Sequence, residues 1–121
     1  DLSPNGPEQG LLQNKKRENL RVIVAGGDGS VCWVHGIMDN LMPTAFPPVG
    51  VLPLGTGNDL ARVLGFGGGY QNESLSKILN DFHSADIVMM DRWGIRCEPL
   101  GEGEGAEEEG EGEGEEAREG A

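Results

Sequence analysis

The residues best suited to chemistry form a glycine-rich turn: Gly26, Gly27, Asp28, Gly29 and Ser30. An apolar run over 21–25 precedes the turn and a helical pattern over 31–42 follows it, so the order is strand, turn, helix. Glycines remove side chains where a ligand must approach, and the helix start offers free N–H groups and a positive dipole end. We therefore expect the turn to hold an anion, most often a phosphate. A tight turn that binds nothing is the alternative.

Asp28 is the residue in this turn that argues for a function beyond chain reversal. A carboxylate among phosphates would repel them unless a cation intervenes, so Asp28 suggests Mg²⁺ binding or a proton-accepting role. The alternative is that Asp28 only caps the helix that follows it. The turn is neither the dinucleotide GxGxxG nor the Walker loop, which ends in Gly-Lys-Ser/Thr. Ser30 lies outside a GxSxG pattern, so we expect it to cap the helix or contact phosphate.

A second turn of this kind follows the apolar run 49–54: Gly55, Thr56, Gly57, Asn58 and Asp59. A helical run over 60–64 comes next. Two strand, turn and helix units predict an α/β fold with a parallel sheet, whose strands end at the edge where open sheets bind ligands. Capping explains any one of Thr56, Asn58 and Asp59, but three together exceed what capping needs. We expect them to bind a ligand at a site shared with the first turn.

The remaining segments complete a predicted sheet of at least three parallel strands. Helices are predicted for 7–18, with Leu11 and Leu12 against the sheet, and for 73–82, whose apolar stripe should also pack on it. Prolines predict a loop over 43–48, and the apolar run 85–90 predicts the third strand. The edge of this sheet should be incomplete. Four apolar residues should therefore be more exposed than their character warrants: Val88, Met90, Trp93 and Ile95.

Composition limits the class of protein. The 121 residues carry a net charge of −12, most of it from the Glu/Gly tail over 101–121, which has ten Glu and one Arg. This tail cannot bury a core, so we expect it to be disordered and residues 1–100 to hold the folded domain. No basic face suggests nucleic-acid binding, and no apolar run is long enough to span a membrane.

The cysteines and histidines show no pattern of a metal site. Cys32 and Cys97 lack CxxC spacing, so a zinc site is not expected and a reducing compartment is the simpler assumption. His35 and His83 have no partners at metal-ligand spacing, and we expect them on the surface or on a helix face.

Four motifs together resemble the catalytic domain of eukaryotic diacylglycerol kinases over about residues 7–99: 26–30 with Trp33, 51–62, 67–70 and 90–93. A GGDG turn alone also fits NAD kinases, sphingosine kinases and phosphofructokinases. The stretch PLGTGNDLAR, with GGGY and DRW after it, is similar to the lipid kinase in particular.

The resemblance implies ATP-dependent, Mg²⁺-assisted phosphorylation of 1,2-diacylglycerol to phosphatidic acid by a cytoplasmic enzyme that associates peripherally with a membrane. It implies the Rossmann-like, ATP-binding half of the fold, with residues 26–30 and 55–59 at the nucleotide and Asp28 as a catalytic residue and possible Mg²⁺ ligand. The family continues into a β-sandwich half with further catalytic carboxylates, whereas here Glu/Gly repeats follow Pro99. We therefore expect that half to be missing and the isolated chain to be nearly inactive. A nucleotide-binding module without turnover and an acidic interaction protein are the alternatives.

Overall fold

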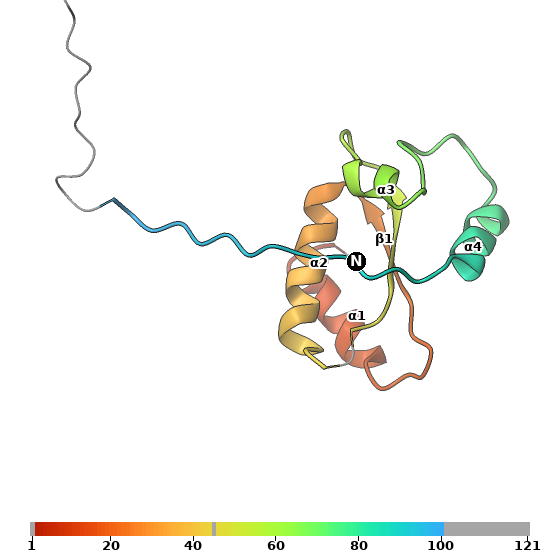
Figure 1. Cartoon of the computed structure of the whole chain (residues 1–121). Coiled ribbons are helices and arrows are strands. Elements are labelled where there is room, and N and C mark those ends of the chain that lie inside the picture. Colours follow the sequence, from red (N-terminus) through yellow and green to blue (C-terminus); the bar gives the residue numbers. More distant parts are fainter. Residues whose placement is uncertain (1, 45, 101–121) are drawn as a thin grey trace, which may run out of the picture. The chain divides into compact units, whose positions relative to one another are not determined.

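The computed structural model describes residues 2–44 and 46–100 of the chain. The tail over 101–121, for which the sequence predicts disorder, lies outside the described residues. The chain divides into two units, residues 1–88 and 89–121, and each is considered by itself. All helices and strands of the described part belong to the first unit (Figure 1).

Two parallel strands form the centre of the first unit. β1 (Val22–Gly26) pairs with β2 (Val49–Pro53), so that Val24 lies opposite Val51. Their β-branched residues suit a half-buried pleated surface. Parallel neighbours need a crossover connection, and α2 (Asp28–Leu41) supplies it. Because each strand runs directly into a glycine turn, both turns lie at the carboxyl edge of the sheet, as predicted.

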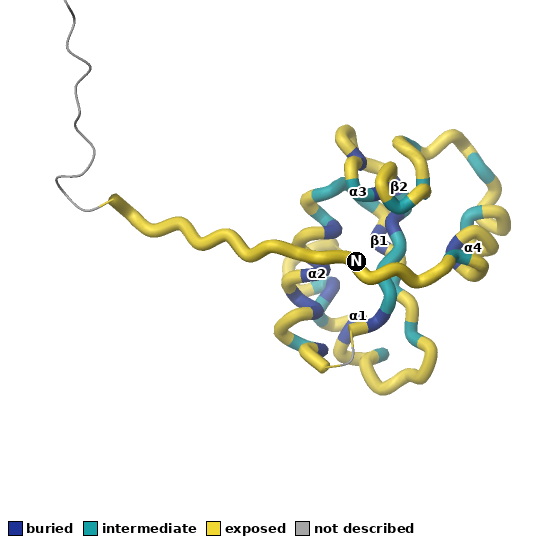
Figure 2. The backbone as a smooth tube through the Cα atoms, in the orientation of Figure 1, coloured by how far each residue is buried: buried dark blue, intermediate teal, exposed yellow. Residues whose placement is uncertain are grey.

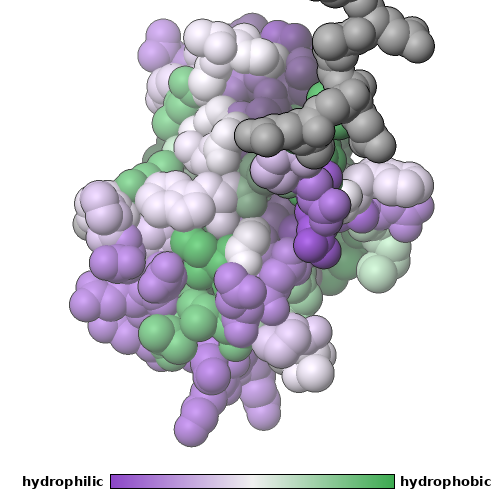
Figure 3. Space-filling model, turned by 90° about the vertical axis from the view of Figure 1, so that its left-hand side faces the viewer, coloured by the Kyte–Doolittle hydropathy of each residue, from purple (hydrophilic) through white to green (hydrophobic). Residues whose placement is uncertain are grey.

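Helices α1 (Gly6–Asn14) and α2 cover one face of the sheet (Figure 1). The buried residues of α2 recur at helical spacing, and Figure 2 shows that burial concentrates where these helices face the strands. Leu11 of α1 joins this core, but Leu12 is exposed, contrary to the prediction, because it points about 100° further round the helix. Seen from the side of α2, the outer surface is largely hydrophilic with scattered hydrophobic patches (Figure 3).

His35 lies on a helix face, as predicted, but that face is the buried one. It lies on the inner side of α2, with its ring centroid 5.9 Å from that of Phe46. The proline-rich loop after α2 carries Phe46 back over the helix, and such a long-range contact leaves no local trace in the sequence. His83 is exposed, as expected.

α3 (Asp59–Val63) follows the second turn, and α4 (Leu75–Ser84) lies on the other face of the sheet. The Phe82 ring lies over Gly50, whose neighbour Val51 points to the opposite face. The ring centroid of Phe82 is 4.8 Å from that of Phe66. Arg21 Nη1 donates a hydrogen bond of 2.9 Å to the Phe82 carbonyl. These contacts hold the carboxyl-terminal end of α4.

The predicted packing of the whole apolar stripe over 73–82 is only partly right. Phe82 is buried, whereas Leu75 is 69% exposed and Leu79 is 51% exposed. A sheet of two strands is roughly 10 Å wide, while ten helical residues are about 15 Å long, so the sheet covers one end of α4. No helix of the described part is long and apolar enough to cross a membrane.

The third strand predicted over 85–90 is wrong, because described residues 85–100 form neither helix nor strand. A strand needs a hydrogen-bonded neighbour, and among the described residues β1 and β2 pair only with each other. The predicted exposure of apolar side chains is confirmed, at 64% for Val88, 42% for Met90, 90% for Trp93 and 90% for Ile95.

Gly50→Ala tests the packing of α4. A Cβ on Gly50 would lie 2.4 Å from a ring carbon of Phe82, so the ring must move. We expect a loss of about 1–3 kcal/mol in the free energy of unfolding, measured by urea denaturation. Gly36→Ala is the control, because Gly36 is exposed in the middle of α2 and the new Cβ would have no atom within 4 Å. It should raise the free energy of unfolding by about 0.5–1 kcal/mol. Equal stability of Gly50→Ala and the unsubstituted chain would contradict this packing.

Candidate functional site

The two glycine turns lie in direct contact. A Cβ on Gly27 would lie 3.1 Å from the Cα of Gly55, and a Cβ on Gly55 would lie 2.5 Å from the Cα of Gly27. The N–H of Leu54 also donates to the carbonyl of Gly26 at 3.2 Å. Side chains at either position would force the two backbones apart. Gly27 and Gly55 therefore allow the two turns to lie side by side, as the sequence predicts, whereas ligand binding by both turns together stays a prediction.

The Asp28 carboxylate joins the turns. Its Oδ2 accepts a hydrogen bond from the N–H of Asp59 at 2.9 Å, and its Oδ1 accepts one from the N–H of Leu60 at 3.0 Å. The first N–H groups of a helix have no partner within the helix, so these are the donors that need a cap. Asp28 begins α2, but its side chain caps α3, the helix of the other motif.

These two hydrogen bonds also set the charge of Asp28. The bond from the Asp59 N–H, followed by that from Leu60, holds the pKa of the Asp28 carboxyl below its usual value. Burial opposes this shift, and the nearby guanidinium of Arg62 adds a smaller lowering. The carboxylate is therefore ionised at neutral pH. A carboxylate with a lowered pKa is a weak proton acceptor, so the arrangement favours a charge or metal-binding role.

Asn58 shapes the second turn from within. It is 2% exposed and has a left-handed backbone with φ of 54°, a conformation that Asn tolerates better than most residues. Its Oδ1 accepts from the N–H of Gly55 at 3.0 Å, and its Nδ2 donates to the carbonyls of Gly55 at 2.8 Å and Gly68 at 2.9 Å. The side-chain amide is thus occupied by the protein itself. Its predicted contact with a nucleotide stays a prediction.

The carboxylates of Asp28 and Asp59 approach a common point beside Gly57. A Cβ on Gly57 would lie 3.2 Å from Asp28 Oδ2 and 3.9 Å from both carboxylate oxygens of Asp59. Thr56 is exposed. No group of three or more His, Cys, Asp or Glu side chains that could hold a metal ion is present in 2–44 and 46–100. Any metal at this point would need further ligands from a substrate or from water.

Gly26 and Gly29 of the first turn differ in whether the surrounding structure requires glycine. A Cβ on Gly26 would lie 2.9 Å from Oγ of Ser30, so Gly26 leaves room for that side chain. A Cβ on Gly29 would have no atom within 4 Å, and Gly29 is exposed in the first turn of α2. Packing therefore does not require glycine at position 29, and the predicted approach of a phosphate to the helix N–H groups there stays a prediction.

Arg62 lies beside the site, although it was not among the predicted site residues, and its side chain contacts Gly68 outside the two turns. Arg62 Nη2 donates to the carbonyl of Gly68 at 3.4 Å, and a Cβ on Gly68 would lie 2.7 Å from Nε of Arg62. The signal that could have found Arg62 is charge, because it is the one basic residue within 26–30 and 55–64.

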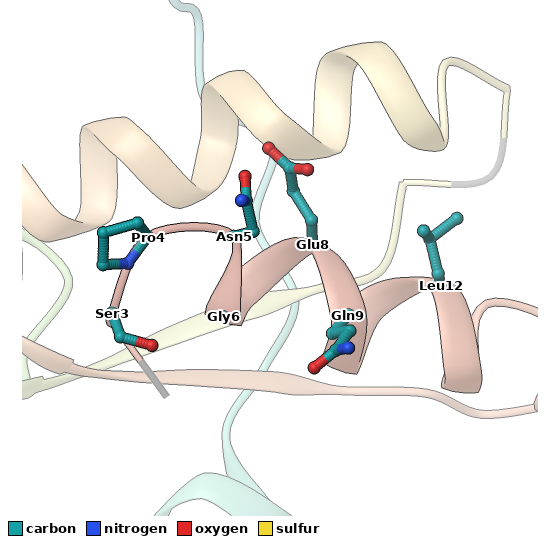
Figure 4. A pocket seen from close by; sticks show the side chains of 7 residues that line it. All are labelled: Ser3, Pro4, Asn5, Gly6, Glu8, Gln9 and Leu12. Carbon is teal, nitrogen blue, oxygen red and sulfur yellow. The ribbon is translucent and has the colours of Figure 1, made fainter.

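A hollow of about 250 Å³ lies elsewhere, at the start of α1. Figure 4 shows its lining, in which Asn5 and Glu8 point toward α2. None of the residues of either glycine turn lines this hollow. It is therefore separate from the candidate site.

Asp28→Asn tests the link between the turns. Asn has one side-chain acceptor where Asp28 has two, so one N–H of α3 loses its partner and the melting temperature at pH 7 should fall. Because the pKa of Asp28 is lowered on folding, its stabilising effect is present above the unfolded value of 3.8 and is lost as pH falls through the folded value. The difference in stability between the two proteins should therefore shrink below about pH 4.

The measurement is thermal unfolding of both proteins at several pH values. Taking the difference removes the effect of Glu73, whose pKa is also lowered, chiefly by the N–H of Gln71. Asp86→Asn, at an exposed carboxylate after α4, is the matched control and should melt like the unsubstituted chain. A pH-independent difference for Asp28→Asn would contradict the capping role.

Comparison with known proteins identifies the family. The family model "Diacylglycerol kinase catalytic domain" matches residues 3–90. Diacylglycerol kinase zeta of Rattus norvegicus is 50% identical over 99 residues, diacylglycerol kinase iota of Mus musculus 52% over 98, and eye-specific diacylglycerol kinase of Drosophila melanogaster 50% over 101. No solved structure matches the chain.

The alignments with these three relatives cover 82%, 81% and 82% of this chain, but only 11%, 9% and 7% of the relatives. The chain thus spans a small part of the length of the curated relatives it matches. The matched segment nevertheless contains both glycine turns and every helix and strand that the described residues form. The chain belongs to the diacylglycerol kinase catalytic domain family.

Proposed function

We propose that this chain supplies the ATP-binding part of a diacylglycerol kinase, which transfers the γ-phosphate of ATP to the hydroxyl of 1,2-diacylglycerol and so forms phosphatidic acid. The observation that carries the proposal is the contact between two glycine turns at the carboxyl edge of paired parallel strands. Ligands of open α/β sheets bind at this edge. The names of the relatives supply the lipid substrate.

The phosphates of ATP fit best at the start of α2. This helix has 14 residues and begins directly in the first turn, so its free N–H groups and dipole favour a negative charge there. The open position at Gly29 lets a phosphate approach the backbone closely. Phosphoryl transfer depends mainly on positioning and charge stabilisation, which such a turn provides.

Asp28 and Asp59 are the residues that would hold Mg²⁺. Their carboxylates approach the same point beside Gly57, and Mg²⁺ is commonly bound through one or two carboxylates together with substrate phosphates. The donor set therefore fits this ion. Bound there, Mg²⁺ would offset the negative charge of the phosphates. Asp28 would act through its charge, because its lowered pKa makes it a weak proton acceptor.

The lipid substrate implies where the enzyme works. Diacylglycerol is held in a membrane, so we propose that the enzyme is cytoplasmic and associates peripherally with the membrane surface.

Nucleotide binding without turnover is the second candidate, because only two described carboxylates lie at the turns. Formation of phosphatidic acid from ATP and diacylglycerol in mixed micelles by this chain would exclude the second candidate. Because the further catalytic carboxylates are expected in the β-sandwich half, the assay separates the two candidates fully only when that half is supplied.

Gly29→Ala tests the phosphate site. The new methyl group meets no protein atom, so the melting temperature should be unchanged or slightly higher. The same methyl would obstruct a phosphate at the helix start, and we expect the affinity for Mg-ATP to fall by about tenfold or more, measured by calorimetric titration. Gly36→Ala lies in the same helix away from the turns and should bind like the unsubstituted chain. Unchanged affinity in Gly29→Ala would contradict phosphate binding at this position.

A further inference from the structure

We propose that Arg62 is a phosphate-binding residue of this site and exchanges its contact with Gly68 for the phosphates of the nucleotide. The inference rests on the proposed ATP binding and adds the cation that recognises the phosphate chain. Arg62 lies on α3, whose first N–H groups are capped by Asp28, so it is anchored beside both turns.

The guanidinium of Arg62 is available for a ligand. Within the described part of the chain its side chain makes one hydrogen bond, a long one of 3.4 Å to the Gly68 carbonyl, and no ion pair. That carbonyl also accepts the shorter bond of 2.9 Å from Asn58 Nδ2. The carbonyl would therefore stay paired if Arg62 moved away. A guanidinium has five N–H donors, so most of the donors of Arg62 are unused by the protein.

The negative charge of the site and of a nucleotide favours a cation at the position of Arg62. Segments 26–30 and 55–64 contain two carboxylates, Asp28 and Asp59, and Arg62 is their one basic residue. The Asp28 carboxylate feels the positive charge of Arg62, which contributes to its lowered pKa. A nucleoside triphosphate adds several negative charges at this place. Arginine suits them because its planar fork pairs two donors with a phosphate in fixed geometry.

A substitution at Gly68 separates the contact between Arg62 and Gly68 from the proposed binding of phosphate by Arg62. A Cβ on Gly68 would lie 2.7–2.9 Å from three guanidinium atoms of Arg62, so alanine there must displace the guanidinium. The φ of Gly68 lies outside the left-handed region, so alanine does not strain the backbone. Gly68→Ala therefore removes the contact but keeps the cation. If Arg62 serves only to tie the segment over 67–69 to α3, this substitution should act like the loss of Arg62 itself.

The experiment measures the affinities of the complete 121-residue chain for Mg-ATP and for AMP by calorimetric titration. Arg62→Gln removes the charge but keeps a donor that reaches toward Gly68, and we expect it to weaken ATP binding by about tenfold or more and AMP binding by less. Arg62→Lys should recover part of the ATP affinity. Gly68→Ala should bind ATP within about twofold of the unsubstituted chain.

Two results would overturn the proposal: unchanged ATP affinity in Arg62→Gln, or an equal loss in Gly68→Ala. The melting temperatures without nucleotide serve as the check on folding, and all three variants should melt within a few degrees of the unsubstituted chain. If the unsubstituted chain binds no ATP, the proposed function fails and this inference fails with it. If it binds ATP equally with and without the charge at position 62, only this inference fails.

Discussion

The two hydrogen bonds from α3 to the Asp28 carboxylate are the constraint on which the site depends. α3 has five residues, too few to be stable on its own, so its start needs a partner from elsewhere in the chain. Asp28 provides that partner while standing at the start of α2. The glycines at 27 and 55 let the two turns come close enough for these bonds. The Asp28 side chain therefore links α3 to the start of α2, in addition to the pairing of β1 with β2.

This arrangement also explains how an acidic residue is tolerated in a turn suited to phosphate. Two N–H donors already compensate the Asp28 carboxylate, so its charge does not depend on a bound cation. The same bonds lower its pKa and keep it ionised. Asp28 thus combines a structural role with the charge that the proposed Mg²⁺ and phosphate site would use. Asn58 also has a structural role, since its buried side-chain amide links the second turn to Gly68.

Local signals in the sequence were sufficient for the order of the elements and for the place of both turns. Apolar runs, glycine turns and helical spacing predict β1, α2, β2 and α3, because each depends on neighbouring residues. The partners of Asp28 could not be predicted, since they lie 31 and 32 positions away. The same holds for Phe82 over Gly50 and for Phe46 over His35. The third strand was predicted from an apolar run alone, but a strand also needs a neighbour.

A pH titration by nuclear magnetic resonance tests the role of Asp28 most directly. The carboxyl carbon of Asp28 and the amide protons of Asp59 and Leu60 would be followed in the same samples. If the carboxylate caps α3, all three signals should titrate with one midpoint, below the ordinary value of 3.8, and the amide protons should move upfield as the carboxylate is protonated. A midpoint at the ordinary value, with no matching change at either amide, would contradict the account.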